Sequence, residues 1–219
     1  MITPLKTTTL HELFSKPILF DANIFMVGIE ERTSNENCSF ENMKILYIQP
    51  LFESFTNIMI HREVYKELDD EAKALVQMYL GKNVTIVDEG GLYGKDPLYT
   101  TIFNNIASHE LVNYERGHAK DRGEVYSLAY AAYHNMNYFC SKEIMVDNVA
   151  HELEELRNVD IITFDIVVLS AYVYYAKKND NTKSKALKAI YKRYCADVIK
   201  RHHLPKTLGE YIIASQNYL

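Results

Sequence analysis

The sequence has few cysteines, glycines and prolines, and it lacks an apolar run long enough to cross a membrane. Its three cysteines, Cys38, Cys140 and Cys195, form no CxxC pair, which argues against a disulfide framework or zinc ribbon and favours a reducing cytoplasm. With 8 glycines and 5 prolines, long flexible linkers are not expected. The best membrane candidate, residues 166–176, has 11 residues and is predicted to be a core helix. Because Asp21 splits the first apolar stretch, no signal peptide is predicted, and we expect a cytoplasmic protein without a membrane partner.

Charge is unevenly distributed along the chain. The net charge is −5, but residues 177–206 contain ten Lys or Arg and two acids, so this segment is +8 and the remainder is −13. A basic segment on an acidic chain is typical of a phosphate-binding surface, and equally of a solvated or docking helix. We predict a main domain over residues 1–175 and a basic helical extension over 176–219.

Short apolar segments alternate with amphipathic ones. Strands are predicted over 17–21, 57–61, 83–88, 138–140 and 159–164, and helices over 10–15, 40–54, 62–80, 98–115, 121–137 and 141–156. In 62–80 the side chains of Val64, Leu68, Leu75, Met78 and Tyr79 are expected on one side. This alternation predicts a three-layer α/β/α fold with a mostly parallel central sheet, plus a C-terminal helical extension.

Acidic residues recur where the predicted strands end, which is where functional groups collect in such sheets. They are Asp21 at the end of the first strand, Glu67 in the helix after the second, Glu124 at the start of an Ala-rich helix, and Glu143 after "YFC", with Asp147 four residues later. At least four converging carboxylates would repel one another, and a divalent cation would relieve that repulsion. Oxygen ligands favour Mg²⁺ or Mn²⁺, and the lack of His or Cys at these positions argues against zinc.

Each of these residues also has a simpler interpretation. Asp21 suits a helix N-cap, and Glu67 suits a solvated helix charge. Glu124 is favoured near a helix N-terminus by the helix dipole, while Glu143 and Asp147 suit the exposed side of their helix. The observation that favours a shared site is that all of them lie near the same edge of the predicted sheet.

These residues occur in four short motifs, in order along the chain. The motifs are "ILFDANIF" with Asp21 and Asn23, "IHREVYKEL" with Glu67, "DRGEVYSLAYA" with Gly123 and Glu124, and "YFCSKE" with Ser141 and Glu143. The ordered set, over about residues 15–170, resembles the PIN domain family of metal-dependent nucleases. Two departures stand out: Glu143 replaces the usual Asp, which leaves Asp147 as a competing ligand, and Glu63 lies on the same helix as Glu67.

The resemblance implies an endoribonuclease that hydrolyses RNA phosphodiester bonds with Mg²⁺ or Mn²⁺. It implies Asp21 as the central metal ligand, with Glu124 and Glu143 or Asp147 beside it, and Glu67 as a further catalytic acid. Asn23 and Ser141 would orient the ligands or water. Basic residues would supply the phosphate contacts, namely Arg122, Lys142, Lys188, Lys192 and Arg193.

The resemblance also raises two hypotheses about partners: an inhibitory antitoxin protein, as for toxins of toxin–antitoxin pairs, and a homo-oligomer. Two rival functions stay open. One is a catalytically weak or inactive PIN-like module that binds RNA or protein, which the Glu at position 143 favours. The other is a haloacid-dehalogenase-type phosphatase, which also has Asp after its first strand but requires a second Asp where Asn23 stands.

Overall fold

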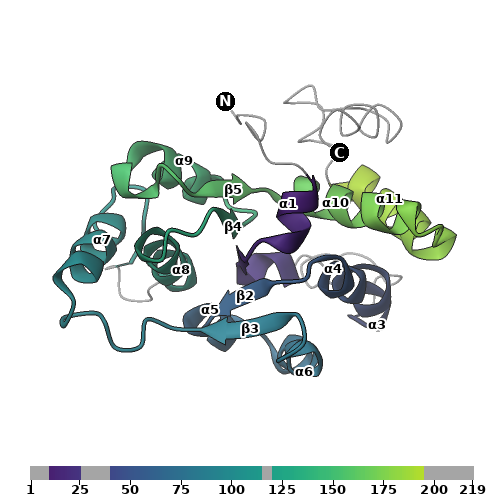
Figure 1. Ribbon diagram of the computed structural model, residues 1–219, viewed down its shortest axis with the longest axis horizontal. Coiled ribbons are helices and arrows are strands. Elements are labelled where there is room, and N and C mark those ends of the chain that lie inside the picture. The colour runs from purple at the N-terminus through teal and green to yellow at the C-terminus, as the bar shows by residue number, and fades with distance from the viewer. Residues whose placement is uncertain (1–9, 26–39, 115–119, 195–219) are drawn as a thin grey trace. The chain divides into compact units, whose positions relative to one another are not determined.

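The computed structural model describes residues 10–25, 40–114 and 120–194 (Figure 1). The chain forms two compact units. One, here called the sheet unit, contains Pro17–Val27 and Ile58–Ile162, and the other, the helical unit, contains Met1–Lys16, Gly28–Asn57 and Thr163–Leu219. The expected boundary near residue 175 stays a prediction, and residues 195–219 of the expected extension lie outside the described ranges.

Five parallel strands form the centre of the sheet unit. They are β1 (Ile18–Phe20), β2 (Ile58–His61), β3 (Val84–Val87), β4 (Tyr138–Cys140) and β5 (Asp160–Ile162), in the spatial order β3-β2-β1-β4-β5. Ile18 pairs with Ile58 on one side and with Tyr138 on the other. The central strands β1 and β4 are buried along their whole length, which explains why they read as apolar runs. The predicted α/β class with a parallel sheet is confirmed, and it is consistent with a three-layer fold followed by helices.

The helices of the sheet unit follow its strands. Residues 22–25 are helical, and the others are α5 (Arg62–Glu67), α6 (Asp70–Tyr79), α7 (Pro97–Ala107), α8 (Arg122–Tyr133), α9 (Ile144–Glu152) and the short 3-10 helix η2 (Glu154–Leu156). The expected single helix over 62–80 is wrong, because Asp69 begins a new helix by accepting a hydrogen bond from the Ala72 N–H at 2.7 Å. Glu67 therefore ends α5, and on α6 Met78 is exposed whereas Leu75 is buried.

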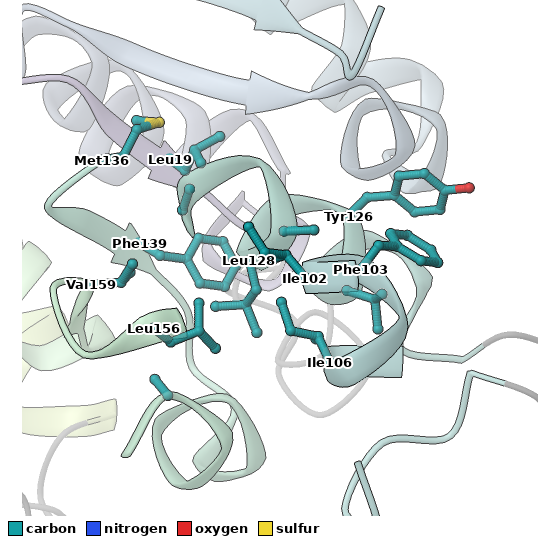
Figure 2. Packing of buried hydrophobic residues seen from close by; sticks show 14 of the residues in the cluster. Leu19, Ile102, Phe103, Ile106, Tyr126, Leu128, Met136, Phe139, Leu156 and Val159 are labelled. Atoms are coloured by element: carbon teal, nitrogen blue, oxygen red, sulfur yellow. The ribbon is translucent and has the colours of Figure 1, made fainter. Parts of the chain in front are cut away.

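The core of the sheet unit lies among α7, α8, β4 and η2. Figure 2 shows Ile102 and Ile106 of α7 near Leu128 of α8, with Phe139 of β4 and Leu156 of η2 beside them. Burial of each such side chain contributes about 1.5–3 kcal/mol to folding. These contacts hold α8 in place, and Gly123 of the third motif is its second residue.

The helical unit contains no strand among its described residues. Its helices are α1 (Leu10–Ser15), α3 (Phe40–Met43), the π-helix η1 (Lys44–Ile48), α4 (Gln49–Ser54), α10 (Phe164–Lys177) and α11 (Asn181–Tyr194). Most of α10 is buried, so the prediction of a core helix over 166–176 is confirmed. Across the described ranges, no helix is both long enough and apolar enough to cross a membrane.

Candidate functional site

The strand order reverses between β1 and β4. From β1 the sheet extends through β2 to β3 on one side and through β4 to β5 on the other. In open parallel sheets, the crevice beyond the carboxyl ends of the strands at such a reversal is where ligands bind. Asp21 and Ser141 directly follow these two strands, and the Asp21 N–H continues the ladder by donating to the Cys140 carbonyl at 2.9 Å. The first and fourth motifs therefore meet at the reversal point.

Asp21 is almost completely buried, at 1% exposure, and both its carboxylate oxygens have partners. Oδ1 accepts from the Ala22 N–H at 2.7 Å, and Oδ2 accepts from the Ser141 hydroxyl at 3.0 Å. The first contact is with the start of the helical turn at 22–25, so Asp21 has part of the capping role that its sequence position also allows. The second contact ties it to the end of β4.

Asn23 and Ser141 hold this carboxylate in a small polar network. The Ser141 hydroxyl accepts hydrogen bonds from the Asn23 side-chain amide at 3.2 Å and from the Glu143 N–H at 3.1 Å. The Asn23 carbonyl oxygen accepts from the Lys142 N–H at 3.0 Å. With both acceptor positions of its oxygen occupied, the Ser141 hydroxyl directs its single hydrogen at Asp21. The structure thus brings Asn23 and Ser141 to Asp21.

Glu67 approaches the start of α8. Its Oε1 accepts from the Gly123 N–H at 3.1 Å, and a Cβ at position 123 would lie 2.8 Å from that oxygen and 3.0 Å from the Val64 Cγ2. Only glycine allows this approach without displacement. The competing acid on α5, Glu63, is already paired with Lys66 and Arg122, each at 2.6 Å. Of the two acids, Glu67 is the one that contacts Gly123.

Glu124 carries the least satisfied carboxylate of the group. Its Oε2 is buried and has no hydrogen-bond partner. Burial raises the pKa of Glu124 to about 8, and repulsion from Asp21, Asp121 and Glu143 adds to the effect. A buried carboxylate oxygen without a partner is costly, so Oε2 is a place where a cation would stabilise the protein.

The other carboxylates respond to the same crowding. Burial raises the pKa of Asp21 to about 7, against the lowering effect of its hydrogen bonds, with Glu67 and Glu143 adding repulsion. Desolvation of its carboxylate likewise raises the pKa of Glu67 to about 7, and Glu124 adds repulsion. The Glu67 residue as a whole is exposed, so water moderates this effect. Repulsion therefore acts among Asp21, Glu67 and Glu124, and the charge of Glu143 adds to it at Asp21 and Glu124.

Other predicted site residues have different surroundings. Glu143 is exposed and precedes α9, while Asp147, within α9, lies 3.6 Å from the His151 ring. Lys142 is exposed beside the Asn23 network. In the helical unit, α11 contains three of the predicted phosphate contacts, Lys188, Lys192 and Arg193. Lys188 is exposed, and the side chains of the other two lie outside the described part of the structure.

The ligand set fits a hard divalent cation in its chemistry, because all the candidate donors are carboxylate oxygens. Within residues 10–25, 40–114 and 120–194, however, no three His, Cys, Asp or Glu side chains are grouped closely enough to hold an ion. The chain thus offers ligands of the kind that Mg²⁺ or Mn²⁺ takes, without a preformed cage.

The sequence interpretation missed His61, the last residue of β2. It is fully buried, its Nδ1 accepts from the Glu63 N–H at 3.2 Å, and its ring stacks on Tyr126 with centroids 5.5 Å apart. Its other nitrogen, Nε2, lies 3.4 Å from Glu89. Burial lowers the pKa of His61 to about 4, so the ring is neutral at pH 7 and caps α5. The available signal was its position between an apolar strand and a helix, which is an N-cap position.

Comparisons of the chain with family models, curated proteins and solved structures found no match. On physical grounds the chain is an α/β protein with a parallel sheet. Near the point where the sheet reverses its strand order it has three acidic residues with raised pKa values, Asp21, Glu67 and Glu124.

Proposed function

We propose that this chain is a Mg²⁺- or Mn²⁺-dependent endoribonuclease, similar in its motifs to PIN domain nucleases, that acts on RNA in the cytoplasm. The observation that carries the proposal is the buried, unpartnered Oε2 of Glu124, on a carboxylate that also experiences repulsion from Asp21 and Glu143. A buried carboxylate oxygen without a partner destabilises the protein when no cation is bound. Binding of a divalent cation at the site would account for it.

In this proposal Asp21 and Glu124 hold the ion, with Glu143 or Asp147 completing its ligands. The ion would supply a water of lowered pKa and would neutralise charge that develops on the phosphate. Ser141 and Asn23 fix the direction of the Asp21 carboxylate through their hydrogen bonds. Glu67 is held by the Gly123 N–H, which leaves its other oxygen for a water at the site.

A site made of carboxylates also needs cationic groups to attract RNA. Lys142 is exposed next to Asn23 in the sheet unit, and Lys188, Lys192 and Arg193 belong to α11 in the helical unit. We include these as phosphate contacts, whose loss would weaken RNA binding in a salt-dependent way. An antitoxin protein and self-association stay hypotheses about partners.

The decisive experiment replaces Asp21 by Asn in the full chain. Asp21→Asn keeps the size of the side chain, and we expect it to abolish Mg²⁺-dependent RNA cleavage, a loss of at least about 100-fold, while the thermal midpoint is retained or raised. Asp70→Asn, on the exposed start of α6, is the matched control and should cleave RNA like the wild type. Full cleavage by Asp21→Asn would end the proposal.

A second candidate is a PIN-like module that binds RNA or protein without cleaving it. Two observations favour it: no three ligand side chains are grouped for an ion among the described residues, and Glu143 is exposed. Titration calorimetry with Mn²⁺ separates the two candidates. Binding that is lost in Asp21→Asn supports the nuclease, whereas no heat of binding near millimolar Mn²⁺ supports the module.

A further inference from the structure

A short ion pair joins α5 to the first residue of α8. The Arg122 Nε lies 2.6 Å from the Glu63 Oε2, and the Glu63 side chain is only 11% exposed. The guanidinium also lies over the Tyr126 ring, 5.2 Å from its centroid. Two separate contacts therefore restrain Arg122, and a charge-assisted hydrogen bond of this length is among the stronger ones in proteins.

The same two helices carry two of the candidate active-site carboxylates. Glu67 ends α5, Glu124 lies two residues after Arg122 on α8, and the Glu67–Gly123 hydrogen bond lies beside the ion pair. His61 connects this arrangement to the sheet, because its Nδ1 accepts the Glu63 N–H from the end of β2. A continuous set of contacts thus runs from β2 through α5 to the start of α8.

We propose that Glu63 and Arg122 are a positioning pair: their ion pair sets the separation of α5 and α8 and thereby holds Glu67 at the Gly123 N–H, beside the residue Glu124. The inference rests on the proposed nuclease function for its effect on cleavage. It assigns Arg122 a role different from the phosphate contact that its place in the sequence suggests. Withdrawing the guanidinium to bind phosphate would leave the nearly buried Glu63 with Lys66 as its remaining cation.

The test is a double-mutant cycle with Glu63→Gln, Arg122→Gln and both together, plus the conservative Arg122→Lys. We expect each single substitution to lower kcat by about 10-fold to 100-fold with KM unchanged, the double variant to be no worse than either single one, and Arg122→Lys to recover part of the loss. Lys66→Gln is the matched control, because Lys66 pairs with the same carboxylate at 2.6 Å but belongs to α5 itself, and it should retain the wild-type kcat.

A phosphate-binding role gives the opposite pattern. Arg122→Gln would then raise KM and reduce the salt dependence of RNA binding by about one charge, while Glu63→Gln would leave kcat unchanged or improve binding. That result would overturn the inference.

Amide hydrogen exchange at Gly123 tests the pair without any reference to cleavage. This N–H donates to Glu67, so its protection reports whether α5 and α8 stay in register. We expect both single substitutions to reduce protection by at least about 10-fold, and Lys66→Gln to leave it unchanged. Unchanged protection in Glu63→Gln and Arg122→Gln would refute the positioning role, whereas a wild type that protects Gly123 but never cleaves RNA would refute only the nuclease function.

Discussion

Gly123→Ala separates the structural and functional roles of the contact between α5 and α8. Alanine is the better helix former, and within a helix the change alone is worth about 1 kcal/mol of stability. Here the new Cβ would lie 2.8 Å from the Glu67 Oε1 and 3.0 Å from the Val64 Cγ2. The carboxylate is the end of a flexible side chain and moves away at little cost, whereas Val64 is fully buried and resists displacement.

Overpacking of this kind costs about 1–3 kcal/mol. Together with the gain in helix propensity of about 1 kcal/mol, the net change is between zero and a destabilisation of about 2 kcal/mol. Glu67 nevertheless loses its place beside the Gly123 N–H, so we expect RNA cleavage to fall by at least about 10-fold. Urea denaturation measures the first effect, and single-turnover cleavage measures the second.

The double variant Glu67→Ala/Gly123→Ala provides the control, because it removes the carboxylate that the new methyl group meets. The added cost of Gly123→Ala should be smaller in that background than in the wild type, since only the contact with Val64 remains. If Gly123→Ala instead stabilises the protein by about 1 kcal/mol and cleaves RNA at the wild-type rate, the close approach of Glu67 to α8 is incorrect.

Two further predictions concern the carboxylates and their hydrogen bonds. The pKa of Glu124 in the folded protein is about 8, above its ordinary value of 4.5. Between these two pH values the folded protein therefore binds more protons than the unfolded chain. Its stability should fall as the pH rises from about 4.5 to 8 in the absence of metal. In urea denaturation, Glu124→Gln should show a smaller fall in stability with pH. At pH 8 it should be more stable than the wild type by at least about 1.4 kcal/mol, the free energy of one pKa unit. Stability profiles of variant and wild type that run parallel with pH would contradict the reasoning. Ser141→Ala should cost about 1–3 kcal/mol by the same measurement, because the Asp21 Oδ2 and the Asn23 amide lose the hydroxyl as a partner. Ser127→Ala removes a buried hydroxyl without a hydrogen-bond partner and should be neutral, so equal costs would refute the Ser141 network.

The alternation of apolar and amphipathic segments was sufficient to predict the fold class and most strands within one or two residues. Parallel strands buried on both faces must be apolar throughout, so β1 and β4 are visible as short runs that end at Asp21 and Ser141. The break between α5 and α6 was missed although Asp69 is an ordinary N-cap residue, because the apolar positions on both sides continue with helical spacing. Local capping took precedence over periodicity at that point.

The order of residues also pointed to candidates for the site, since groups that directly follow buried parallel strands, such as Asp21, are restricted to one edge of the sheet. It could not assign partners across the chain. That Glu63 pairs with Arg122, 59 residues away, while Glu67 binds the Gly123 N–H, depends on how closely α5 packs on α8. Likewise, burial of the Glu124 Oε2 without a partner results from side chains supplied by several elements, and desolvation of this kind exists only once those elements have packed together.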